Sequence, residues 1–239
     1  MCIIAIKKLG VNYPSQETMD EMCRRNPDGF ALGWHIKGQK KSHIIRTLDV
    51  KKIMKKYQQL VKQYDKDECT MFLHARIKTH GTIKVENCHG WYSHIAKTLF
   101  AHNGILSIEN RNDLTDSETF YRDIFEPIFS VYGWRGAEKA INAIIGTSKF
   151  CFLDQDGNLR HYGNYIEESD GMLYSNSSYK PIFWHQYSHY AQSLRSSYYP
   201  SSYGKQQQQS RHDDWAKNFD ESWQDTTTQD KCGEQDFIW

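Results

Sequence analysis

The residue with the most distinctive chemistry is Cys2, because it directly follows the initiator methionine. A small second residue lets Met1 be removed, which leaves Cys2 with a free α-amine whose ordinary pKa is about 7.7–8.0. That amine can serve as general base for the thiol of the same residue, without a separate histidine. Many proteins carry cysteine at position 2 as a small buried residue that begins a strand, so other segments must decide between the two interpretations.

Four further segments have the residue types of one enzyme family, in its order. They are Arg25-Asn26-Pro27-Asp28-Gly29, His74-Ala75-Arg76-Ile77-Lys78-Thr79-His80-Gly81, Ala101-His102-Asn103-Gly104-Ile105-Leu106 and Leu114-Thr115-Asp116-Ser117-Glu118-Thr119. With Met1-Cys2-Ile3-Ile4, this set resembles the class II, N-terminal nucleophile (Ntn) glutamine amidotransferases. It is closest to the glutaminase domains of the glucosamine-6-phosphate synthase and amidophosphoribosyltransferase type. The resemblance covers residues 2 to about 180.

The resemblance implies roles for two charged side chains. Arg76 presents a planar, two-pronged guanidinium suited to the α-carboxylate of glutamine, and the family uses the matching arginine in this way. Its ordinary alternative is a surface ion pair, which the preceding apolar run 71–73 disfavours. Asp116 would bind the α-ammonium group, although the segment 115–118 is also a good helix-capping sequence.

The remaining residues of the expected site would shape the reaction centre. Asn103 and Gly104 would supply a side-chain amide and a backbone N–H to the oxyanion, whereas Asn-Gly by itself is typical of a type I′ turn. Thr79 and His80 resemble residues that line the glutamine pocket. Asp28 and Gly29 fall where the family has a turn beside the nucleophile, although Asp-Gly alone is a common turn and a lone histidine is more often structural.

The sequence departs from the family pattern in two places. The family often has Asn-x-His-Pro-Phe after the arginine, whereas Gly90 stands here in place of the proline. The aromatic residue that follows the arginine is replaced by Ile77. These departures concern the fine shape of the glutamine pocket rather than the catalytic groups.

Local patterns predict the elements that must position these residues. Short, β-rich apolar runs predict buried strands over 3–6, 30–34, 71–73, 98–101 and 150–153. Helical spacing predicts helices over 15–25, 49–64 and 116–131, which begin at Ser15, at Asp49, and at Asp116 or Ser117. The last two helices would place Val61 and Val131 on their apolar faces. Residues 154–157, Asp-Gln-Asp-Gly, predict a hairpin turn. Strands with inserted helices predict an α+β protein, and the resemblance specifies the Ntn-hydrolase αββα sandwich of two antiparallel sheets.

Composition excludes several classes of protein. Lys and Arg number 30 against 29 Asp and Glu, so the chain lacks the basic excess of a nucleic-acid binder. No apolar run approaches the roughly 18 residues of a membrane span, and the start does not resemble a signal peptide. The six cysteines are scattered without CxxC pairs, which favours reduced thiols in the cytoplasm. No His/Cys cluster has the spacing of a zinc site, so we expect no metal and no cofactor.

The composition changes near residue 185. Residues 2–184 would form the glutaminase domain, whereas 185–239 are Tyr/Ser/Gln-rich and then acidic. Such a segment buries little aliphatic surface, so we expect a mostly disordered tail. Typical family members carry a second, synthase domain that receives the ammonia, and this tail is too short to be one.

The resemblance therefore implies a stand-alone glutamine amidotransferase. Cys2 would attack the side-chain amide of L-glutamine, and water would then hydrolyse the γ-glutamyl thioester to glutamate. The ammonia would pass to a separate synthase. Two alternatives remain open: an Ntn amidase acting on another γ-glutamyl or amide substrate, and a catalytically idle binding subunit with the same fold.

Overall fold

Two antiparallel sheets form the centre of the protein, and the larger has six strands in the order β3-β2-β4-β1-β10-β9. The computed structural model describes residues 2–78, 82–109 and 114–181. The strands of this sheet are β1 (Ile3–Lys7), β2 (Phe30–Ile36), β3 (Ser42–Thr47), β4 (Cys69–Ala75), β9 (Ile166–Glu167) and β10 (Leu173–Tyr174). Because β1 pairs with both β4 and β10, it is an interior strand of the sheet.

The second sheet has four strands in the order β5-β6-β7-β8. They are β5 (Trp91–Ser93), β6 (Thr98–Asn103), β7 (Lys149–Asp154) and β8 (Leu159–Tyr162). The predicted turn joins β7 to β8, with the Gly157 N–H donating to the Asp154 carbonyl at 3.2 Å. Gly157 has φ +85°, a conformation that favours glycine. The hairpin prediction is confirmed.

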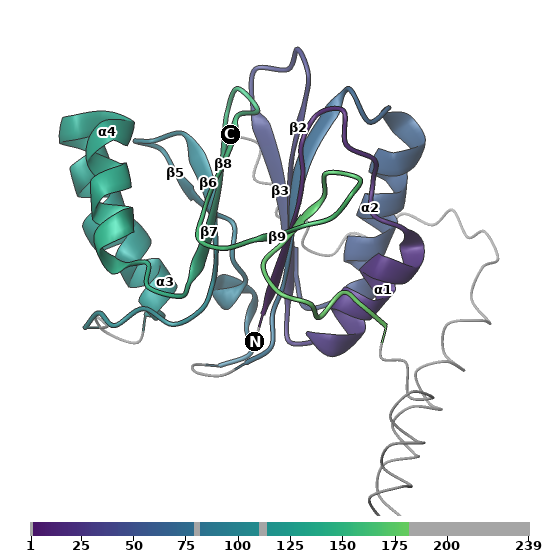
Figure 1. Cartoon of the computed structure of the whole chain (residues 1–239), viewed down its shortest axis with the longest axis horizontal. Coiled ribbons are helices and arrows are strands. Elements are labelled where there is room, and N and C mark those ends of the chain that lie inside the picture. Colours follow the sequence, from purple (N-terminus) through teal and green to yellow (C-terminus); the bar gives the residue numbers. More distant parts are fainter. Residues whose placement is uncertain (1, 79–81, 110–113, 182–239) are drawn as a thin grey trace, which may run out of the picture. The chain divides into compact units, whose positions relative to one another are not determined.

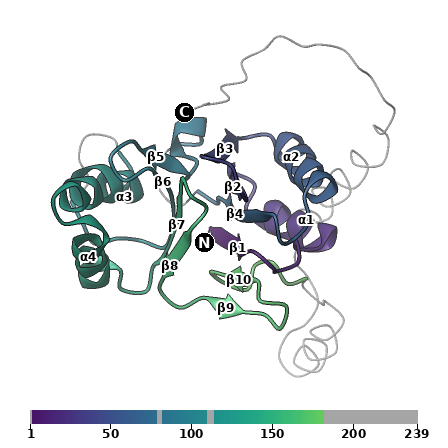
Figure 2. The same cartoon turned by 90° about the horizontal axis from the view of Figure 1, so that it is seen from above.

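Helices cover the outer faces of both sheets (Figures 1 and 2). Helices α1 (Gln16–Arg25) and α2 (Val50–Gln63) pack on the six-stranded sheet, and α3 (Asp116–Thr119) and α4 (Glu126–Ile144) pack on the four-stranded one. Between the sheets, Ile4, Ile6 and Phe72 pack against Leu99 and Ala101. The structure is therefore the expected αββα sandwich. None of the helices in the described ranges is both long enough and apolar enough to cross a membrane.

The first two helices begin where the sequence predicts. Ser15 Oγ accepts a hydrogen bond from the Thr18 N–H at 3.1 Å, and Asp49 Oδ1 accepts one from the Lys51 N–H at 2.8 Å. Both residues are N-caps. The apolar face of α2 is buried as expected, except that Val61 is 42% exposed, so its assignment to that face was wrong.

The third predicted helix differs from its sequence pattern. Its N-cap is Thr115, whose hydroxyl accepts from the Glu118 N–H at 3.2 Å, so Asp116 is the first helical residue instead of the cap. A π-helical segment, Phe120–Phe125, separates α3 from α4. The predicted apolar face includes Val131, but this residue is 69% exposed and precedes a kink at Gly133, where φ is +57°.

Candidate active site

Cys2 directly precedes β1, and Arg76 directly follows the neighbouring strand β4. The antiparallel register pairs Ile3 with Ala75, so the residue before Ile3 faces the residue after Ala75. Cys2 is partly buried, and its Sγ lies 3.6 Å from the Ile77 carbonyl oxygen. Burial raises the pKa of the Cys2 thiol, and the positive charge of Arg76 partly opposes this shift. A thiol in this position is protonated at neutral pH, so it requires a base before it can act as a nucleophile.

The turn that contains Asp28 and Gly29 supports the backbone of Arg76. The Arg76 N–H donates to the Gly29 carbonyl and the Asp28 N–H donates to the Arg76 carbonyl, each at 2.8 Å. Asp28 Oδ2 accepts from the Lys78 N–H at 2.7 Å. Gly29 has φ +146°, and a Cβ there would lie 2.6 Å from Cys88 Sγ. The structure therefore places Asp28 and Gly29 beside Arg76, where they fix its main chain.

The side chain of Arg76 is buried and reaches the segment that follows β4. Its Nη1 donates to the Thr82 carbonyl at 3.2 Å, and Asn87 Nδ2 donates to the same oxygen at 2.9 Å. The buried side chains of Arg76 and Asn87 thus both bind the main chain at Thr82. Thr79 and His80, the expected pocket residues, lie outside the described residues.

Asn103 and Gly104 lie at the end of β6, in the other sheet. Asn103 is a strand residue and only Gly104 has a positive φ, +146°, so this pair does not form the type I′ turn that Asn-Gly alone suggests. A Cβ on Gly104 would lie 2.2 Å from Ser148 Oγ. The buried Asn103 side chain donates through Nδ2 to Ser175 Oγ at 2.8 Å, and the Ile4 N–H donates to the same hydroxyl at 2.8 Å. One hydroxyl therefore links Asn103 to the strand that carries Cys2.

Asp116 is tied to the loop and strand that precede it. Its Oδ2 accepts from the Leu106 N–H at 2.8 Å and its Oδ1 accepts from the Ser117 N–H at 2.8 Å. Ser117 Oγ lies 2.6 Å from His102 Nδ1. Burial lowers the pKa of His102 to about 4, against the opposing charge of Asp116. Asp116 is thus connected through Ser117 to the residue next to Asn103.

Three buried histidines connect the two sheets beside this site. The rings of His74 and His89 stack with centroids 4.0 Å apart, and those of His89 and His102 are nearly parallel at 6.1 Å. The main-chain N–H of His102 donates to the ring nitrogen Nδ1 of His89 at 3.0 Å. Burial lowers the pKa of all three, that of His74 to about 3, so the rings are neutral at pH 7.

The residues that follow β10 also belong to the site, and no family motif in the sequence points to them. Ser175 accepts hydrogen bonds from both sheets, and Asn176 Nδ2 donates to the Cys2 carbonyl at 2.6 Å. The signal that could have identified them is the polar run 175–178, which directly follows the apolar residues 172–174. Over the described ranges, no group of three or more His, Cys, Asp or Glu side chains is arranged to hold a metal ion.

One family model matches this sequence, and solved structures of low sequence identity are similar to this chain. The model of the family described as glutamine amidotransferases class-II matches residues 1–148. A glutamine aminotransferase class-II domain protein from Silicibacter pomeroyi is 14% identical over 73% of this chain and 87% of its own, with a TM-score of 0.42. Glutamine phosphoribosylpyrophosphate amidotransferase from B. subtilis is 12% identical over 75% of this chain and 42% of its own, with a TM-score of 0.46. The present chain therefore spans less than half of that enzyme. No curated protein matches the sequence.

Proposed function

The chain belongs to the class II glutamine amidotransferases, and from this premise we propose that it hydrolyses the side-chain amide of L-glutamine to glutamate and ammonia. The observation that supports this most directly is the convergence of three groups. Cys2, just before β1, lies opposite Arg76, just after the neighbouring strand β4. Asn103 is linked through Ser175 to Ile4 of β1. The proposal assigns Cys2, Arg76 and Asn103, which come from separate parts of the sequence, the roles of nucleophile, carboxylate-binding cation and oxyanion donor.

The proposed reaction uses the α-amine of Cys2 as its base. The amine takes the thiol proton as sulfur bonds to the amide carbon, and it returns a proton to the departing ammonia. Asn103 and the Gly104 N–H stabilise the oxyanion of the tetrahedral intermediate. The side-chain amide of Asn103 has two N–H bonds, and only one of them is directed at Ser175. Water activated by the same amine then cleaves the γ-glutamyl thioester, releasing glutamate and the free thiol.

The binding roles follow from the two charged ends of glutamine. Arg76 pairs with the α-carboxylate and Asp116 with the α-ammonium group. Thr79 and His80, which lie outside the described residues, keep in this proposal the pocket role that the family resemblance implies, and Asp28 and Gly29 hold the main chain of Arg76 in place. This two-charge arrangement favours an amino-acid substrate over the other amides that an Ntn amidase could hydrolyse.

The product ammonia passes, in this proposal, to a separate synthase in a reducing compartment such as the cytoplasm. The scattered cysteines support such a compartment. Copurification of the untagged chain, followed by identification of an enzyme that consumes ammonia, tests for this partner.

The nucleophile carries the decisive test. While Met1 is attached, the nitrogen of Cys2 is an amide and cannot accept a proton, so the active chain should begin at Cys2 and intact-mass spectrometry should show the loss of one methionine. Cys2→Ala should abolish release of glutamate from glutamine, and Cys2→Ser should leave a trace. Cys23→Ala, which changes a buried cysteine on α1, is the matched control and should retain activity.

The outcomes separate the three hypotheses. Full glutaminase activity in Cys2→Ala, or in a chain that still carries Met1, would contradict the mechanism. Turnover of another γ-glutamyl amide but not of glutamine would identify a different Ntn amidase. Glutamine binding without turnover by a chain that begins at Cys2 would identify an idle binding subunit.

A further inference from the structure

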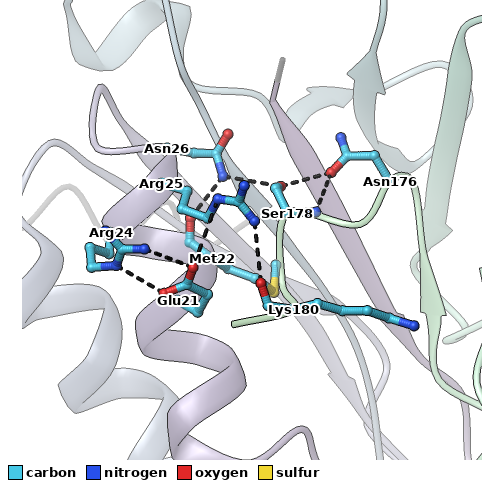
Figure 3. Close-up of polar contacts among 8 residues, drawn as sticks. All are labelled: Glu21, Met22, Arg24, Arg25, Asn26, Asn176, Ser178 and Lys180. Carbon is cyan, nitrogen blue, oxygen red and sulfur yellow. Dashed lines mark hydrogen bonds and ion pairs between the residues drawn. The ribbon is translucent and has the colours of Figure 1, made fainter. Parts of the chain in front are cut away.

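A short polar segment crosses the site from β10 to helix α1. We call residues Ser175–Lys180 the polar strap. Its first two residues form hydrogen bonds with Ile4 and Cys2. Its later residues Ser178 and Lys180 contact the carboxyl end of α1 (Figure 3). Nothing in the proposed reaction uses its side chains, although one of them contacts both sheets.

Ser175 is a point at which hydrogen bonds join the two sheets, as Ser42 and Asp154 do elsewhere. Its hydroxyl accepts from the Ile4 N–H and from Asn103 Nδ2, each at 2.8 Å, and its own N–H donates to the Ile4 carbonyl at 2.9 Å. All three residues are buried, with exposed fractions of 3% or less. Because a hydroxyl has two lone pairs, this one oxygen satisfies both donors and sets the position of Asn103 relative to β1.

Asn176 holds the nucleophile itself. Its Nδ2 donates to the Cys2 carbonyl at 2.6 Å. Its Oδ1 accepts from the N–H and the hydroxyl of Ser178, at 2.9 and 2.7 Å. Since Ser178 supplies only donors to that oxygen, the orientation of the amide is set, and its N–H must point toward Cys2.

Helix α1 anchors the far end of the polar strap. Asn26 Nδ2 donates to the Met22 carbonyl and to Ser178 Oγ, and Arg25 Nη1 donates to the Lys180 carbonyl at 3.3 Å. Figure 3 shows these contacts side by side at the end of the helix. The strap is thus fixed at both ends, which a positioning element requires.

We propose that Ser175 and Asn176 are positioning residues that hold Asn103 and Cys2 in their reacting geometry; this inference rests on the proposed glutaminase function. In that function the amine and the thiol belong to one residue, so the placement of the Cys2 main chain sets where both groups lie relative to Asn103 and the substrate. The oxyanion donor acts only in the transition state. Displacement of either group by about 1 Å can reduce turnover on the order of 100-fold, while ground-state binding through Arg76 and Asp116 is retained.

The test compares kcat and KM for glutamine in full-length Ser175→Ala and Asn176→Ala chains. Active sites are counted by covalent labelling of Cys2 with a chloroketone analogue of glutamine. Per labelled site, each variant should lose about 10- to 100-fold in kcat, with KM changed less than about threefold. Ser175→Thr, which keeps the hydroxyl, should restore most of the loss. Ser177→Ala, an exposed neighbour on the same strap, is the matched control and should behave as wild type.

A purely structural role would lower the melting temperature or the labelled fraction and leave kcat per labelled site unchanged, and that result would overturn the inference. If Ser175→Ala does not fold, Asn176→Ala decides alone, because Asn176 is only partly buried. An active wild type with unimpaired variants refutes the positioning role only. A wild type that begins at Cys2 and does not hydrolyse glutamine refutes the proposed function and this inference together.

Discussion

The two halves of the sandwich pack their helices in different ways. On the six-stranded sheet, the regular helices α1 and α2 bury flexible and aliphatic side chains such as Met19, Met22 and Ile53. On the four-stranded sheet, the segment formed by α3, the π-helical residues and α4 packs aromatic side chains against aromatic side chains of the sheet. Phe152 has its ring centroid 4.8 Å from that of Phe125 and 5.4 Å from that of Trp134.

The π-helical segment explains how the second half achieves this packing. Residues five apart lie on one face of a π-helical turn, so Phe120 and Phe125 both enter the core, with centroids 6.3 Å apart. Tyr121 also stacks on Phe125 at 5.2 Å. The half that carries Cys2 and Arg76 is specified by local caps and a regular apolar stripe. The half that carries Asn103 and Asp116 also has a local cap at Thr115, but its core adds contacts between rings distant in sequence, such as Phe125 and Phe152.

This difference predicts unequal sensitivity of the two cores. Phe152→Ala should lower the free energy of unfolding by about 3–5 kcal/mol, because a fully buried ring leaves a cavity among other rigid rings. Met22→Leu, a change of similar volume on α1, should cost less than about 1.5 kcal/mol. Urea denaturation of both variants measures the contrast, and equal losses would show that the two halves do not differ in packing tolerance.

In contrast, each half should supply one charged residue of similar importance for binding glutamine. Arg76→Lys keeps the charge but loses the two-pronged geometry, and Asp116→Asn removes the charge that would pair with the ammonium group. Each should lower kcat/KM by an amount that corresponds to about 2–4 kcal/mol of lost transition-state stabilisation, mainly through a higher KM, with the circular dichroism spectrum unchanged. Wild-type efficiency in Arg76→Lys would remove Arg76 from the glutamine site.

The histidine stack that joins the halves should make stability depend on pH. Burial lowers the pKa of His74 to about 3 in the folded state, whereas an unfolded histidine has a pKa near 6.5. Between these values the unfolded chain binds more protons, so stability should fall as the pH drops below about 6.5. His74→Phe keeps a ring on His89 and should reduce the loss between pH 7 and pH 4.5 by about 2 kcal/mol. Denaturation curves at both pH values check this prediction. An equal loss of unfolding free energy between pH 7 and pH 4.5 in the variant and the wild type would contradict it.

The helix caps provide the smallest and most local comparison. Ser15→Ala and Thr115→Ala should each cost about 1 kcal/mol of stability, because each leaves one N–H of the first turn without its side-chain acceptor. Only Thr115→Ala should also raise the KM for glutamine, since Thr115 begins the helix that carries Asp116. An equal effect of both variants on KM would show that Asp116 does not depend on its cap.

Prediction from sequence worked best where interactions are short in range. The strands around positions 3–6, 30–34, 71–73, 98–101 and 150–153 and the caps Ser15 and Asp49 were confirmed. Strand β3 was missed because five of its six residues are only partly buried, so it lacks the apolar run of a buried strand. The position of Val131 was wrong because a helical period cannot reveal the π-helical segment and the kink at Gly133.

The sequence by itself determined the chemical groups of the candidate site: the Cys2 thiol that follows Met1, the Arg76 guanidinium group and the Asn103-Gly104 pair. Each lies within a recognisable local segment. It also determined the capped helices, because a cap is a hydrogen bond between residues two or three positions apart. Only the tertiary structure decided how these groups are held. The Ile4 N–H donates to Ser175 Oγ across a separation of 171 residues, which depends on the pairing of β1 with β10. Asn103 Nδ2 donates to the same oxygen across 72 residues, which depends on the stacking of the two sheets. No local pattern specifies that pairing, because its energy comes from strand register and burial that exist only after the whole sandwich has formed.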